Sequence, residues 1–189
     1  MSDGPLLWYL NRATGIVLLV LLTASVVLGV LSMGGRPGRG LPRFVSQALH
    51  RNVALLSVLL LAAHVLTAVV DEYVDIRWWH ALVPLGASYE PVWLGLGTLS
   101  LDLMVAVAIT SVMRARLAHR SWRAIHLFSW LAWASAAAHA VGIGTDLTTR
   151  GGSAVVPAAA CLAAVVAALG VRLGHWWRST PATTRERSA

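Results

Sequence analysis

Five long apolar stretches separated by polar connections dominate the hydrophobic pattern of this chain. A helix needs about 20 mostly apolar residues to cross a hydrocarbon layer of about 30 Å, and each stretch is close to that length. The stretches are Ala13–Leu31, Leu49–Val70, Pro91–Met113, Trp122–Val141 and Ala154–Leu173. The pattern therefore predicts an all-α integral membrane protein, a bundle of five transmembrane helices.

The composition agrees with this class. Of the 189 residues, 57% are hydrophobic and only 12% are charged, which is typical of membrane proteins. The single cysteine, Cys161, excludes an internal disulfide, a cysteine-held iron–sulfur cluster and covalent haem attachment at a CxxCH motif. The basic residues are distributed along the chain as membrane topology requires, so we expect lipid as a partner and no nucleic acid.

The arginines predict the orientation, because cytoplasmic connections carry an excess of basic residues. Twelve of the fifteen fall on one side: Arg36, Arg39, Arg43, Arg51, Arg114, Arg116, Arg120, Arg123, Arg172, Arg178, Arg185 and Arg187. We expect a multi-pass protein of the cell (plasma) membrane, with the N-terminus outside and the C-terminus in the cytoplasm. Residues 1–174 form one predicted domain, and residues 175–189 a short, disordered cytoplasmic tail.

The connection Asp71–Glu90 is longer than the others and contains Tyr73, Trp78 and Trp79. Aromatic rings with a polar edge favour the headgroup layer, so we expect a short amphipathic helix on the outer surface. It would serve as an interfacial anchor or as a docking surface for an outer partner. We interpret His80, His119 and His175 as surface histidines; His80 could instead contact an outer acceptor.

Four further histidines form two spaced pairs within the apolar stretches. His50 and His64 are fourteen residues apart, and His126 and His139 are thirteen apart. These gaps span about 20 Å along a helix, so each helix would carry one histidine near each membrane face. With the predicted topology, His50 meets His126 at the inner level, and His64 meets His139 at the outer level.

Two imidazoles from different helices can serve as the axial ligands of a haem iron. The pattern thus predicts two stacked b-type haems, with His50, His126, His64 and His139 as the metal ligands. The alternative is histidines that only hydrogen-bond between helices, or that bind another metal. The alanines of the fourth stretch offer room for a flat macrocycle, although small residues also serve helix packing.

The angles between the histidines are less regular. Fourteen residues return a side chain to about 40° from its start, whereas thirteen residues leave about 140°. Either the two haems are rotated relative to each other, or the fourth helix contains a bulge.

Several other residues are candidates for a role beside the haems. Arg51 and Arg123 are candidates for binding the propionates of the inner haem, or they enforce topology and touch lipid phosphates. Asp102, in mid-span, either hydrogen-bonds a neighbouring helix or lines a haem edge, proton path or quinone pocket. Trp130 and Trp133 lie between the histidine levels, where they pack or assist electron passage.

The histidine stretches resemble the ferric reductase-like transmembrane family. They read HRNVALLSVLLLAAH from His50 to His64 and HLFSWLAWASAAAH from His126 to His139, and WYLNRATG, WLGLGTLSLDL and GIGTD support the likeness. The resemblance implies a haem-containing oxidoreductase subunit that moves electrons from a cytoplasmic or membrane donor to an acceptor outside. It implies a flavoprotein or a quinol as donor, and ferric iron, a flavin-binding protein or a reductase as acceptor.

The chain departs from the full-length members of that family because no GxGxxG fingerprint is present, and GLG at Gly95–Gly97 lies inside a span. We therefore expect no flavin or NAD site in this chain. Two other functional classes stay open. One is a quinol-linked haem subunit that serves an extracytoplasmic reductase or flavoprotein, and the other is a non-redox membrane scaffold or transporter.

Overall fold

The computed structural model describes residues 6–32, 42–71, 76–84, 86, 89–143 and 155–179, without the side chains of residues 6, 175, 176, 178 and 179. The described residues are helical and contain no strand. The long helices are α1 (Leu6–Ser32), α2 (Arg43–Val70), α3 (Pro91–Val112), α4 (His119–Gly142) and α5 (Val155–Ser179), with short 3-10 helices η1 (Trp78–Ala81) and η2 (Arg114–Arg116). All five long helices are long and apolar enough to cross a membrane. The predicted all-α, five-helix membrane fold is therefore confirmed.

Four of the five long helices are longer than the apolar stretches that revealed them, and α3 ends one residue earlier than predicted. α1 begins at Leu6 and α2 at Arg43, both well before the first strongly apolar residue of the stretch. Hydrophobicity marks the part of a helix inside hydrocarbon, whereas the hydrogen-bonded backbone can continue into the headgroup layer. α5 likewise continues past the expected domain boundary to Ser179, and the rest of the predicted tail, 180–189, lies outside the described residues.

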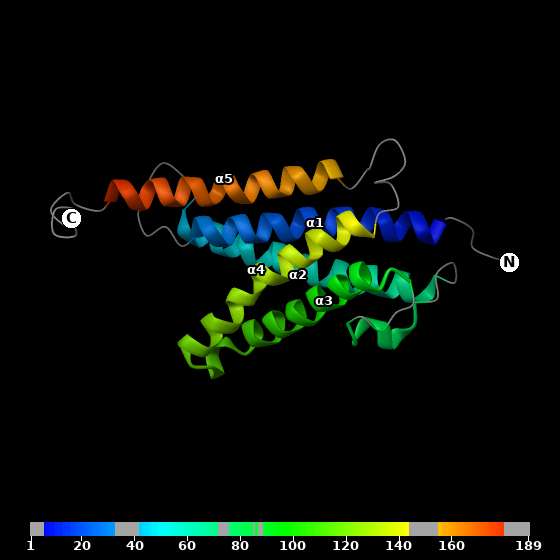
Figure 1. Ribbon diagram of the computed structural model, residues 1–189. Helices are drawn as coiled ribbons and strands as arrows, with labels where there is room; N and C mark the ends of the chain where they lie inside the picture. The colour runs from blue at the N-terminus through cyan, green and yellow to red at the C-terminus, as the bar shows by residue number, and fades with distance from the viewer. Residues whose placement is uncertain are drawn as a thin grey trace.

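The bundle consists of two helical hairpins and a fifth helix (Figure 1). α1 packs along α2, and α3 packs along α4, while α5 lies against α1. α1 also contacts α4, so it lies at the centre of the bundle. The backbones of α2 and α4, the two helices that carry the paired histidines, come close at almost no position.

The core lies where α1, α4 and α5 meet. Leu18 and Leu22 of α1 pack with Trp133 of α4 and Val165 of α5, and all four are buried. The Trp133 Nε1–H donates a buried 2.9 Å hydrogen bond to Thr23 Oγ1, which satisfies the indole in an apolar setting. In contrast, α2 exposes Leu59 and Leu66, at 70% and 63%, as expected of a surface that faces lipid.

The connection between α2 and α3 contains a short helix, as predicted, but it is the single 3-10 turn η1. Trp78 is 64% exposed and Trp79 39% exposed, which suits headgroup anchoring. Tyr73 lies outside the described residues. The turn is tied to the bundle by Thr98 of α3, whose hydroxyl donates a 2.8 Å hydrogen bond to the carbonyl of His80.

Two helical glycines provide a matched test of the α3–α4 packing. A Cβ atom at Gly142 would overlap the Trp93 ring, whereas nothing lies within 4 Å of one at Gly170. Because overpacking costs about 1–3 kcal/mol, we expect Gly142→Ala to lower the thermal midpoint in detergent. Gly170→Ala should leave it unchanged or raise it, since alanine favours the helix. Circular dichroism measures the midpoints. Equal midpoints for the two variants would contradict the close packing of Gly142 against Trp93.

Candidate functional site

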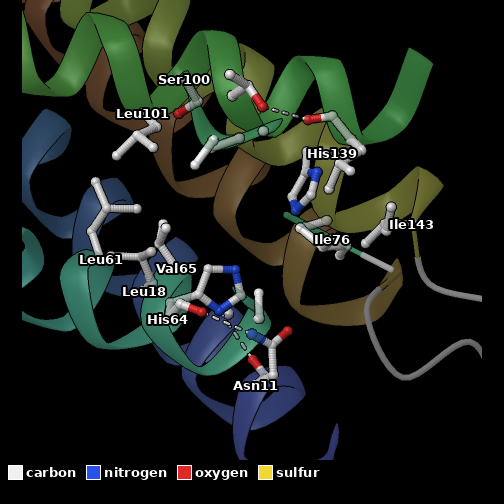
Figure 2. A pocket seen from close by; sticks show the side chains of 18 of the residues that line it. Asn11, Leu18, Leu61, His64, Val65, Ile76, Ser100, Leu101, His139 and Ile143 are labelled. Atoms are coloured by element: carbon white, nitrogen blue, oxygen red, sulfur yellow. Dashed lines mark hydrogen bonds between the residues drawn. The ribbon is translucent and has the colours of Figure 1, made fainter. Parts of the chain in front are cut away.

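The structure brings the four spaced histidines together as the two predicted pairs. The ring centroids of His50 and His126 are 6.2 Å apart. His64 and His139 line one cavity of about 250 Å³ between the hairpins, and Figure 2 shows their rings facing it from α2 and α4. Each pair thus takes one ring from each hairpin.

Each histidine of α2 is oriented by the backbone of α1. His64 Nδ1 donates to the carbonyl of Asn11 at 3.1 Å, and Thr14 Oγ1 lies 3.3 Å away. His50 Nδ1 donates to the carbonyl of Ser25 at 2.9 Å, with Ser25 Oγ at 3.3 Å. A carbonyl oxygen only accepts, so the ring proton sits on Nδ1 and the lone pair on Nε2. Both rings are therefore fixed in the tautomer that leaves Nε2 available.

His139 of α4 follows the same rule with α3. Its Nδ1 donates to the carbonyl of Trp93 at 2.8 Å. Three of the four histidines thus donate to a backbone carbonyl of the partner helix in their own hairpin. A hydrogen bond of this kind commonly orients a metal-binding imidazole and raises its basicity.

A glycine accompanies each of these three carbonyls, four residues further along the helix. The glycines are Gly15 after Asn11, Gly29 after Ser25 and Gly97 after Trp93. A Cβ at Gly15 would lie 3.1 Å from the His64 ring, one at Gly29 would lie 3.5 Å from His50, and one at Gly97 would lie 2.6 Å from His139. We call this arrangement, a carbonyl at position i with a glycine at i+4, a histidine seat.

The seat has a simple physical origin. In an α-helix the carbonyl at position i already accepts the N–H of residue i+4. A side chain at i+4 stands beside that carbonyl and obstructs an approaching ring, whereas glycine leaves the second lone pair accessible. The seats were not predicted, although the sequence contains a signal for them: Gly15 and Gly29 are fourteen residues apart, the spacing of His50 and His64.

His126 is the exception among the four. Its Nδ1 is buried and has no hydrogen-bond partner among the described residues. The ring instead stacks on Trp122 at 5.0 Å, and Arg114 Cζ lies 4.5 Å above that indole. Thirteen residues along α3 from Gly97 stands Thr110, not glycine, and its hydroxyl hydrogen-bonds the carbonyl of Ala106. α3 therefore offers a seat to His139 but none to His126.

α4 is an unbroken α-helix from His119 to Gly142. The bulge considered for this helix is therefore not present, and the angular offset between His126 and His139 remains. Trp133 belongs to the buried cluster formed by α1, α4 and α5, and Trp130 packs against the same cluster. Both tryptophans thus have the predicted packing role.

The alanines of α4 are divided between packing and the cavity. Ala136 and Ala140 line the cavity. Ala132 is fully buried, and its carbonyl accepts a 2.8 Å hydrogen bond from Ser100 of α3. Ala137 packs against the buried cluster of α1 and α5. Small residues therefore serve both of the purposes considered for them.

The interpretation of His80 as a surface histidine is wrong. Its side chain is only 9% exposed and lines the same cavity as His64 and His139. The reason is the η1 turn, which faces the tryptophans outward and folds the next residue back against α3. His119 is exposed, as expected, and the side chain of His175 lies outside the described part.

Three other candidates do not reach the histidine pairs. Arg51 and Arg123 are exposed, and neither contacts His50 or His126 in the part of the chain that the structure describes. Their binding of haem propionates stays a prediction. The arginine associated with the His50–His126 pair is Arg114, through Trp122. Asp102 is half-buried and is not among the residues that line the cavity.

Residues 6–146 match the model of a family described as a domain of unknown function, DUF8596. The chain belongs to this family. The matched region of the DUF8596 chain contains α1 to α4, all four paired histidines and the three seats, and it ends before α5. No curated protein and no solved structure matches the chain. The function therefore has to be argued from the site.

The three seat glycines give a graded prediction. The added methyl group would be closest to the ring at Gly97, intermediate at Gly15 and in ordinary contact at Gly29. We expect Gly97→Ala to destabilise the chain by about 1–3 kcal/mol, Gly15→Ala by less, and Gly29→Ala hardly at all. Thermal unfolding in detergent measures the order. A Gly29→Ala variant as unstable as Gly97→Ala would contradict the seats.

Proposed function

We propose that this chain is a transmembrane electron-transfer subunit that holds two b-type haems. His50 and His126 would bind one iron, and His64 and His139 the other. The observation that carries the proposal is the hydrogen bonding of Nδ1 at His50, His64 and His139. It leaves Nε2 of each ring as a lone pair in a fixed direction, as an axial ligand requires.

The separation within the His50–His126 pair supports the proposal. Two metal–imidazole bonds of about 2 Å each, plus about 1 Å from each nitrogen to its ring centre, place the centroids about 6 Å apart. The rings are 6.2 Å apart. Ordinary contact between two aromatic rings gives centroid distances in the same range. The distance therefore agrees with ligation but does not distinguish it from ring contact, and the proposal depends on the hydrogen bonding of Nδ1.

The architecture between the hairpins supports a flat cofactor. α2 and α4 hardly touch, and the cavity between them is bounded by His64 and His139. An ion held by protein alone commonly takes four side-chain ligands. In the described part no group of three or more such residues occurs. Two facing imidazoles instead fit a group that brings its remaining ligands with it, as a porphyrin does.

The chemistry would be the transfer of single electrons, which a haem with two axial imidazoles supplies without an open coordination position. The chain's own contribution is to hold the rings. Each seat fixes a ring orientation through a carbonyl that already belongs to a helix, so the ligand geometry changes little between oxidation states. Trp133 supports this arrangement by packing with Leu18, Leu22 and Val165 in the buried core.

The direction of transfer rests on the resemblance to the ferric reductase-like family and on the arginine distribution. Electrons would enter from a cytoplasmic flavoprotein or a membrane quinol at the His50–His126 pair. They would leave from the His64–His139 pair to an acceptor outside, such as ferric iron, a flavin-binding protein or a reductase. The N-terminus would then lie outside and the C-terminus in the cytoplasm.

The test is an optical spectrum of the detergent-purified chain, oxidised and reduced with dithionite, with haem counted per polypeptide. We expect two b-type haems per chain with sharp low-spin bands in the reduced state. A chain that stays colourless after expression with ample haem, and after reconstitution, would overturn the proposal and leave a scaffold or transporter.

Single histidine variants test the pairing. We expect His64→Ala and His139→Ala each to lose one haem and retain the other, because removal of one axial imidazole opens only that site. His119→Ala, on the exposed start of α4, is the matched control and should keep both haems. Haem content and the reduced spectrum are the measurements. Two haems per chain in both single variants would show that the pairing is wrong.

A further inference from the structure

We propose that His80 is a hydrogen-bond donor to a carboxylate of the haem held between His64 and His139. The inference rests on the proposed function and assigns a binding role to a residue outside the four ligands. Its first support is location: His80 is 9% exposed and lines the cavity, whereas Trp78, two residues earlier, is 64% exposed.

The tautomer of His80 is opposite to that of the proposed ligands. The backbone N–H of Arg77 donates to His80 Nδ1 at 3.1 Å. A neutral imidazole that accepts at Nδ1 carries its proton on Nε2. His64 and His139 donate from Nδ1 and keep a lone pair on Nε2. His80 therefore offers the cavity an N–H group rather than a metal ligand.

This donor has no partner of its own. Among the described residues, the hydrogen bonds of His80 are those of its Nδ1, its carbonyl and its backbone N–H, and none involves Nε2. A polar N–H at the edge of an apolar cavity is costly unless an acceptor fills the position. An oxygen acceptor on an occupant of the cavity would satisfy this N–H.

The position of the donor is fixed relative to the ligand pair. Thr98 Oγ1 donates a buried 2.8 Å hydrogen bond to the His80 carbonyl. Thr98 follows Gly97, the seat glycine of His139. One turn of α3 therefore places both His139 and His80, so an occupant that binds the first would meet the second at a defined distance.

Haem itself supplies acceptors of the kind that His80 needs. Arg12 and Asp71 line the same cavity, together with Asn11, whose carbonyl accepts the hydrogen bond from His64. Haem carries two propionates, and a charged acceptor forms stronger hydrogen bonds than a neutral one. The volume of about 250 Å³ lies near the lower limit of small-molecule sites. His64, His139 and His80 all line this one cavity, so a single occupant would meet all three side chains.

The experiment measures haem release from the full, haem-loaded chain to excess apomyoglobin. The haem of the His50–His126 pair is the internal reference. Its release is recognised from the His64→Ala variant, which is expected to retain only this haem. We expect His80→Phe to speed release from the His64–His139 site about tenfold or more, the effect of losing one charged hydrogen bond. His80→Gln, which keeps an N–H donor, should restore most of the retention. His119→Phe should change nothing.

A second arm identifies the acceptor. The apoprotein is reconstituted with haem dimethyl ester, in which both carboxylates are capped. Release of the ester from the wild-type chain and from His80→Phe should agree within about twofold. Thr98→Val, which removes the hydrogen bond to the His80 carbonyl but keeps the His80 side chain, should speed release of haem but not of the ester. It also serves as the test should His80→Phe fail to fold.

Failure of the His80 role and failure of the proposed function give different results. A wild-type chain without haem overturns the function. A wild-type chain with two haems whose release is unaffected by His80→Phe overturns only the role of His80. Equal acceleration for haem and ester would also overturn it, since His80 would then support the fold. Unchanged release with impaired oxidation of duroquinol would overturn it as well and assign the donor to a quinone carbonyl.

Discussion

The interaction on which the rest of the site depends is the hydrogen bond from an imidazole Nδ1 to a backbone carbonyl of the neighbouring helix. Inside hydrocarbon no water can satisfy a ring N–H, so it must find an acceptor within the protein. His64 finds Asn11, His50 finds Ser25 and His139 finds Trp93. Each bond lies within one hairpin, so the hairpin alone decides the ring orientation, and the space between the hairpins is left to whatever the rings bind.

The same constraint makes the two pairs unequal. At the His64–His139 pair both rings occupy seats, whereas the His50–His126 pair has only one. His126 Nδ1 has no hydrogen-bond partner in the described part of the chain. That leaves the tautomer of the ring unfixed, and the ring stacks on Trp122. The hydrogen-bond partner of a metal-binding imidazole influences its basicity. In the proposed function, the two haems would therefore differ in reduction potential although both are held by two histidines. Electron transfer from one haem to the other would use such a difference.

The sequence allowed the five helices and the histidine pairing to be predicted, because apolar length and a repeated spacing are one-dimensional signals. It did not allow the burial of His80 to be predicted, because a single 3-10 turn folds that residue inward after two exposed tryptophans. The seats were missed for another reason. Glycine in a membrane helix usually indicates that two helices pack closely. Only the structure shows that Gly15 and Gly97 make room for the rings of His64 and His139.

The helices that carry the four paired histidines do not form the site alone, because α1 positions several of the side chains. It carries none of the four histidines, yet it supplies the carbonyls of Asn11 and Ser25, the seats at Gly15 and Gly29, and the Thr23 hydroxyl that holds Trp133. It also packs against α2, α4 and α5. A change in α1 would therefore reach both pairs at once, whereas a change in α3 at Gly97 would reach only the His64–His139 pair. The helix that carries none of the four histidines is therefore the one that joins the two pairs.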